Sequence, residues 1–181
     1  MIKIEAGDPL LTKEHILSIP DELCPMMVFS FGIGSPIATA IAMKEHGVYN
    51  HFMWLLSPGW LATQEVVFRM IPVENYMGKY ALKFVYNKMW QIEDREKLRE
   101  AIKEGLAKPW YRRLYDPLAI AGQALNLEWL QIPGLDICSD KGKYLKLVDR
   151  NYNLKYPSPT NINNWMKKQE GYTVYGRYRL D

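Results

Sequence analysis

Two side chains in this sequence have the chemistry of a thiol nucleophile and its base. Cys138 lies in the run "DICSD", after the turn signal Pro133-Gly134 and just before Lys141–Val148, whose apolar spacing predicts an amphipathic helix. A thiol at a helix start faces free backbone N–H groups and the positive end of the helix dipole, which favour the reactive thiolate. His51 lies in the predicted buried strand "YNHFMWLL", where a polar ring needs a reason to be present. The pair predicts nucleophilic catalysis.

Each residue also has a purely structural interpretation. A lone cysteine at a helix start can be a small buried apolar residue, and a histidine in a strand can bond a neighbouring carbonyl. A disulfide between Cys138 and Cys24 is a third alternative, although a chain with 2 cysteines has no other mark of a disulfide-stapled domain.

Composition favours one folded domain over residues 1–181. Hydrophobic residues make up 48% and charged residues 24% of the 181 positions, and a chain of this size buries roughly 70% of its unfolded surface. The net charge of +3 is concentrated in residues 141–181, which hold 9 basic and 3 acidic side chains with interleaved tyrosines. Such an arm could bind nucleic acid. We prefer a solvated face whose tyrosines pack inward, so a nucleic-acid partner is not expected.

Neither a signal peptide nor a transmembrane segment is expected. Met1–Asp8 is too polar for a signal peptide and has no hydrophobic region. Met26–Met43 is free of charge and about long enough to span a bilayer, but Gly32, Gly34 and Pro36 interrupt it. The pattern instead predicts a buried strand followed by a helix capped by Ser35.

Strands dominate the first half of the sequence and helices the second, which predicts an α+β fold. Strands are expected at Met26–Phe31, Tyr49–Leu56, Trp60–Ile71, Ala81–Tyr86 and, as an edge strand, Tyr172–Arg179. Helices are expected at Pro36–His46, from Glu93 to Lys108, from Asp116 onward, at Lys141–Val148 and at Thr160–Gln169. Short connections between successive strands favour antiparallel pairing.

The order of these elements resembles the circularly permuted papain-like hydrolases of the NlpC type. The chain has a strand with His51, a second strand with a polar residue, a helix start at Tyr115-Asp116 and a Cys-Ser-acid helix start at Cys138. Relatives of this group include the YiiX-type proteins and, more distantly, the lecithin retinol acyltransferases. The resemblance spans roughly Met26 to Trp165 and implies a papain-like antiparallel sheet packed against helices, with the histidine strand before the cysteine helix.

The same resemblance assigns roles to individual residues. It implies that Cys138 is the nucleophile, that His51 is the base, and that the third polar residue falls on Gln64 in "LATQEVVF". Glu65 is the alternative, and the two-residue period of a strand puts Gln64 and Glu65 on opposite faces, so only one can address the ring. Asp140 stands where the group commonly has glutamate.

The implied function is a cysteine peptidase or amidase that cleaves an amide bond, with cell-wall peptides as the usual substrate. Neither a cofactor nor a metal is expected. Without a signal peptide, such an enzyme would act in the cytoplasm or be delivered by a phage. A lipid acyltransferase or thioesterase of the same fold is the first alternative. A non-catalytic module that binds nucleic acid or protein is the second, and the oligomeric state stays open.

Overall fold

The computed structural model describes residues 7–31, 49–116, 118–119, 136–154 and 157–179. These residues form an α+β fold around a six-stranded sheet in the order β4-β3-β2-β1-β5-β6, and every neighbouring pair is antiparallel. The strands are β1 (Met26–Phe31), β2 (His51–Ser57), β3 (Trp60–Gln64), β4 (Phe68–Pro72), β5 (Ala81–Asn87) and β6 (Tyr172–Tyr178). The α+β class, the antiparallel pairing and the position of β6 at a sheet edge are therefore confirmed.

The single strand predicted over Trp60–Ile71 is wrong, because the structure divides it into β3 and β4. The chain turns between Gln64 and Phe68. Backbone groups in this turn bond another segment: Tyr115 N donates to Val66 O, and Phe68 N donates to Arg113 O, both at 2.8 Å. An exposed salt bridge of 2.8 Å between Glu65 and Arg69 also spans the turn. The break in the strand thus depends on long-range contacts that alternation cannot reveal.

The helices include α1 (Lys13–Leu17), α3 (Ile92–Ala107), α5 (Pro159–Met166) and the 3₁₀ helices η1 (Asp21–Leu23), η2 (Val73–Asn75), η3 (Trp110–Arg112) and η4 (Cys138–Leu147). The helix predicted from Glu93 to Lys108 is confirmed as α3, which ends before Pro109. The helix start at Cys138 is confirmed too, although η4 has 3₁₀ rather than α geometry. The predicted helix Pro36–His46 and most of the one after Asp116 lie outside the described residues.

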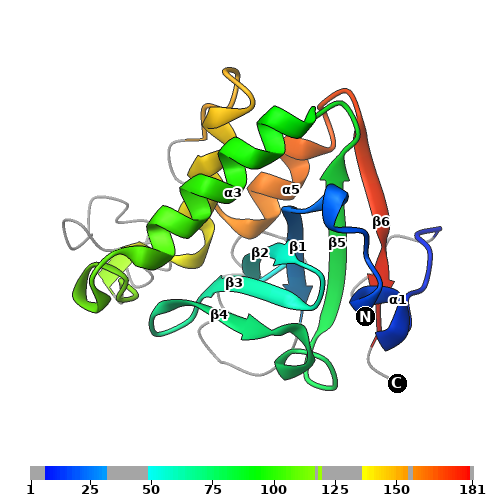
Figure 1. Ribbon diagram of the computed structural model, residues 1–181, viewed down its shortest axis with the longest axis horizontal. Coiled ribbons are helices and arrows are strands. Elements are labelled where there is room, and N and C mark those ends of the chain that lie inside the picture. The colour runs from blue at the N-terminus through cyan, green and yellow to red at the C-terminus, as the bar shows by residue number, and fades with distance from the viewer. Residues whose placement is uncertain (1–6, 32–48, 117, 120–135, 155–156, 180–181) are drawn as a thin grey trace.

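Helices cover one face of the sheet, and α1 lies at the other end of the molecule, near β6 (Figure 1). The helix-side core joins apolar residues of the sheet to side chains from three helices, among them Leu98 of α3, Leu145 of η4 and Ile162 of α5. The opposite face packs against Ile16 and Ile19, with Met53 and Leu55 contributed by β2. Within the described ranges, no helix combines the length and the apolar character needed to cross a bilayer.

The turn between β2 and β3 sets the pairing of these two strands. Gly59 has a φ of +74°, a left-handed conformation that favours glycine, and a β-carbon there would lie 3.1 Å from Leu17 Cδ2. The register shifts between Leu55 and Ser57, and Met53 is then paired with Thr63. This register decides which β3 side chains share a face with His51.

Candidate active site

The candidate site lies where the pairing of β2 with β3 ends. The last paired residues are Met53 and Thr63, and His51 begins β2 just beyond them. Alternation along the strand places Phe52 and Trp54 in the helix-side core and His51 with Met53 on the other face. The imidazole therefore lies at the end of the ladder, on the face opposite the helices.

Two neighbours hold the His51 ring. Its Nε2 atom lies 2.7 Å from Thr63 Oγ1, in hydrogen-bond contact, and its ring stacks on that of Tyr76, with the centroids 6.0 Å apart and the planes at 5°. Thr63 is fully buried, Tyr76 is buried just after η2, and His51 is partly buried. A hydrogen bond on one side and a ring face on the other fix the orientation of the imidazole.

A chain of polar contacts continues from Thr63 to the surface. Thr63 Oγ1 lies 3.2 Å from the Tyr76 hydroxyl, which donates to Glu65 Oε1 at 2.9 Å. Glu65 Oε2 accepts a hydrogen bond of 2.8 Å from Arg69. Burial alone would raise the pKa of Glu65, but the hydrogen bonds from Arg69 and Tyr76 outweigh it and hold that pKa below its usual value. The series of polar contacts that begins at His51 thus ends at the carboxylate of Glu65.

Cys138 approaches the same end of β2 from the helix side. It is the first residue of η4, and η4 is fixed to β2 because Trp54 Nε1 donates to the carbonyl of Lys141 at 3.1 Å. The backbone N–H of Phe52, the hydroxyl of Tyr115 and the backbone N–H of Ser139 act on the thiol as donors that lower its pKa. Phe52 directly follows His51, so the thiol lies beside the strand residue that adjoins the imidazole.

The pKa of the Cys138 thiol is raised to about 11, because burial outweighs the three hydrogen bonds to it. The side chain is 5% exposed, and the nearby Asp140 carboxylate raises the pKa further. The prediction that the helix start lowers this pKa is therefore wrong. The positive potential at the start of η4 is too small to offset the loss of water around a charged sulfur.

Tyr115 and Asp116, the predicted helix start, flank the thiol. Asp116 N donates to Asp136 O at 3.1 Å, which fixes this segment just before η4. The Asp116 carboxylate accepts the N–H groups of Leu118 at 2.9 Å and Ala119 at 3.0 Å, as a residue that caps a helix does. Burial, followed by the proximity of Cys138, raises the pKa of Tyr115. Tyr115 therefore stays a neutral hydrogen-bond donor at any physiological pH.

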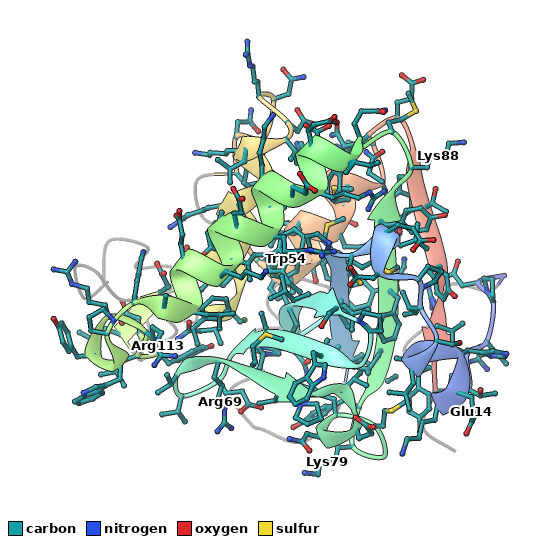
Figure 2. The ribbon with its side chains drawn as sticks, viewed as in Figure 1. Glu14, Trp54, Arg69, Lys79, Lys88 and Arg113 are labelled. Atoms are coloured by element: carbon teal, nitrogen blue, oxygen red, sulfur yellow. The ribbon has the colours of Figure 1, made fainter. Side chains whose placement is uncertain are left out.

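Gln64 lies on the face of β3 opposite Thr63. Its Nε2 atom donates to Arg113 O at 2.8 Å, and its buried Oε1 atom has no hydrogen-bond partner among the described residues. It therefore holds the segment before Tyr115, while Thr63 bonds the ring that Gln64 was expected to orient. Figure 2 shows Arg113 and Arg69 at the same end of the molecule, around the turn between β3 and β4.

Burial lowers the pKa of His51 to about 4, and the Glu65 carboxylate only partly opposes this shift. The imidazole is thus neutral at pH 7, and so is the thiol. The site therefore rests as a neutral thiol and a neutral imidazole, and a thiolate–imidazolium pair would form only when a reaction begins.

The lowered pKa of His51 predicts a loss of stability in acid. A histidine has an unperturbed pKa near 6.5, so its contribution is complete above that pH and is lost as the pH falls towards the folded value of about 4. Urea unfolding from pH 7 to pH 4 should therefore show a fall in the free energy of unfolding, of which His51 accounts for up to about 3 kcal/mol. A His51→Phe variant should have a flatter pH dependence. Parallel curves for wild type and His51→Phe would contradict the lowered pKa.

Sequence reasoning missed Thr63, Tyr76 and the thiol contact of Tyr115. The period of β3 already put Thr63 and Glu65 on one face, which was the available signal for Thr63. Tyr76 follows a turn and η2, and no local pattern connects it to His51.

The structure contradicts one of the alternatives and bears on another. Cys24 and Cys138 are both free thiols, so the disulfide is contradicted. In the basic C-terminal arm, Tyr152 is buried, and Tyr144, Tyr172, Tyr175 and Tyr178 are partly buried. That packing agrees with tyrosines that face inward. Among the residues that the structure describes, no group of three or more His, Cys, Asp or Glu side chains could hold a metal ion.

Comparison of the chain with protein-family models and with curated proteins gives no match.

Proposed function

We propose that this protein is a cysteine-dependent acyl-transfer hydrolase, with a permuted papain-like arrangement, that attacks an amide carbonyl. The observation that carries the proposal is that the backbone N–H of Phe52 acts on the Cys138 thiol and lowers its pKa. Since Phe52 directly follows His51, this places a nucleophile and a base from opposite halves of the sequence at one strand end. A thiol and an oriented imidazole are the two groups that thioester chemistry requires.

The resting protonation states define the first step. Because the thiol has a pKa of about 11 and the imidazole one of about 4, no ion pair waits for the substrate. His51 takes the proton from Cys138 Sγ as sulfur bonds to the carbonyl carbon, which is general-base catalysis. The imidazolium then gives that proton to the leaving amine as the C–N bond breaks. Water attacks the thioester in the second half, again with His51 as base, and releases the acid and the free thiol.

Three donors surround the sulfur: Phe52 N–H, Ser139 N–H and the Tyr115 hydroxyl. They stabilise negative charge on sulfur as it forms, and the Tyr115 hydroxyl and Ser139 N–H are the candidates to turn toward the oxyanion of the tetrahedral intermediate. A preorganised donor of this kind is worth about 3 to 4 kcal/mol in the transition state. Cell-wall peptides remain the substrate class that the resemblance favours.

A lipid or thioester acyl substrate is the second candidate. It is favoured by exposed apolar side chains on segments that contact or adjoin Tyr115, at Val66, Trp110, Tyr111 and Leu118. Val66 O accepts Tyr115 N–H, so this apolar surface includes the turn that positions Tyr115. A rate of hydrolysis that increases with the length of the acyl chain would support this second substrate class. A rate that does not depend on chain length would favour an amide substrate.

Selective alkylation tests whether Cys138 is the reactive thiol. Burial raises the pKa of Cys24 to about 12, above that of Cys138, and Cys24 is fully buried. Iodoacetamide should therefore label Cys138 first, as read by mass spectrometry of peptides. The labelling rate should rise about tenfold for each pH unit from 7 to 10, because the thiolate fraction does so. Preferential labelling of Cys24, or a rate independent of pH, would count against the assignment.

A further inference from the structure

The direction of each hydrogen bond between His51 and Glu65 follows from counting protons. The ionised carboxylate of Glu65 can only accept, so the Tyr76 hydroxyl uses its one proton to donate to Glu65 Oε1, at 2.9 Å. Toward Thr63, at 3.2 Å, the Tyr76 oxygen has only lone pairs left. Thr63 must therefore be the donor in that contact.

The same reasoning reaches the imidazole. The Thr63 hydroxyl has one proton and has given it to Tyr76, so in the 2.7 Å contact with His51 Nε2 it must accept. Nε2 then carries the ring's N–H, and Nδ1 carries the lone pair. Thr63 could donate to Nε2 only if its 3.2 Å contact with Tyr76 carried no proton. Reversing every bond would require a protonated Glu65, which the hydrogen bond and ion pair from Arg69 at 2.8 Å oppose.

We propose that Glu65, acting through the hydroxyls of Tyr76 and Thr63, is the positioning residue that fixes His51 in the Nε2–H tautomer and stabilises its imidazolium. Nδ1 is thereby the atom that accepts the thiol proton. This role rests on the proposed function, whereas the tautomer itself does not. In this arrangement no carboxylate contacts the ring directly. The charge of Glu65 acts on His51 through the two intervening hydroxyl groups.

The groups that face His51 are consistent with this assignment. Among the residues that the structure describes, Glu65 is the carboxylate that acts on the pKa of the ring, and it raises that pKa against the larger effect of burial. Tyr76 and Tyr115 stay protonated, since burial raises the pKa of each. Arg69 is engaged by Glu65, and the Cys138 thiol is neutral near pH 7. The charge that His51 meets on protonation is therefore that of Glu65.

Nitrogen NMR of the imidazole tests the tautomer without any substrate. In wild-type protein at pH 7, the ¹⁵N shifts of His51, assigned with a His51→Phe variant, should show a protonated Nε2 and an unprotonated Nδ1. Thr63→Val removes the acceptor and should give a mixture of the two tautomers, while Thr63→Ser keeps the hydroxyl and should restore the single form. A protonated Nδ1 in wild type, or an unchanged single tautomer in Thr63→Val, would overturn the proposal.

Titration of the same signals tests the charge. Glu65→Gln should lower the pKa of His51 by roughly half a unit to one unit, as the loss of one nearby carboxylate does. It should also slow acyl transfer by about tenfold if the imidazolium is an intermediate. Glu74→Gln is the control, because Glu74 pairs with Lys13 at 3.9 Å away from the ring. No shift in the His51 pKa on Glu65→Gln would overturn the proposal.

These readings separate the two proposals. A single Nε2–H tautomer with no acyl transfer would support the proposed hydrogen-bond series and contradict the proposed enzymatic function. Acyl transfer that requires Cys138, together with a protonated Nδ1, would support the enzymatic function and contradict the hydrogen-bond series. Circular dichroism of each variant ensures that a changed signal comes from a folded protein.

Discussion

Replacing Cys138 by alanine should abolish acyl transfer, with a loss of at least a thousandfold against an activated ester such as p-nitrophenyl acetate and against small amide substrates. The sulfur forms the covalent bond in the proposed reaction, and removal of a nucleophile typically leaves only the effect of binding and oxyanion stabilisation. The rate of product release by purified protein measures this, with single-turnover trapping of the thioester as a second reading.

Cys24→Ala is the matched control for this experiment. Cys24 is the other free thiol, and it is buried in the core on the face opposite the helices, so its loss should cost some stability but no activity. His51→Phe should reduce the rate nearly as far as Cys138→Ala, since the thiol pKa of about 11 leaves little thiolate near pH 7 without a base. Equal activity in Cys138→Ala and Cys24→Ala would rule out Cys138 as the nucleophile.

Replacing Trp54 by alanine should destabilise the fold by about 3 to 5 kcal/mol, as deletion of a large buried aromatic side chain does. Trp54 is fully buried, its ring packs edge-on against Phe52 at 5.3 Å between centroids, and it bonds η4 through Lys141 O. Figure 2 places it between the sheet and α3. Chemical denaturation followed by circular dichroism measures the loss.

Two further variants separate packing from the hydrogen bond. Trp54→Phe keeps most of the ring but removes the N–H that donates to the Lys141 carbonyl, which should cost about 0.5 to 1.5 kcal/mol. Trp60→Ala, at a side chain 46% exposed, should have little effect. If Trp54→Ala and Trp60→Ala had similar stabilities, η4 would not depend on Trp54, and the account of how Cys138 is held would fail.

Much of this sheet could be predicted from the sequence because its patterns are local. Met26–Phe31 and the strand containing His51 are continuous apolar runs, as strands buried on both faces are, and Pro109 limits α3 from within the sequence. The Trp60–Ile71 run could not be divided in this way, because the turn inside it is held by Arg113 and Tyr115, which lie far along the chain.

The candidate site, too, could be predicted only where local patterns were sufficient. Cys138 and His51 could be named from the residue types and their predicted elements. Gln64 was preferred over its neighbours by the resemblance and by spacing. Neither carries information about Tyr76, whose hydroxyl links Thr63 to Glu65. The pKa of Cys138 was predicted in the wrong direction because the loss of water around sulfur depends on packing from β2 and Tyr115, which a local sequence window does not contain.

The turn at Gly59 has a consequence for the chemistry at the opposite end of its hairpin. Its left-handed backbone and the adjoining bulge set the register of β3 against β2. The register determines which residue of β3 lies beside His51. Alternating residues of β3 offer a hydroxyl at Thr63 and an amide at Gln64, so the length of this loop selects which functional group meets the imidazole. A change of one residue in the loop would turn Thr63 to the other face of the strand without altering any residue of the site. The hairpin loop is thus a remote determinant of which side chain meets His51.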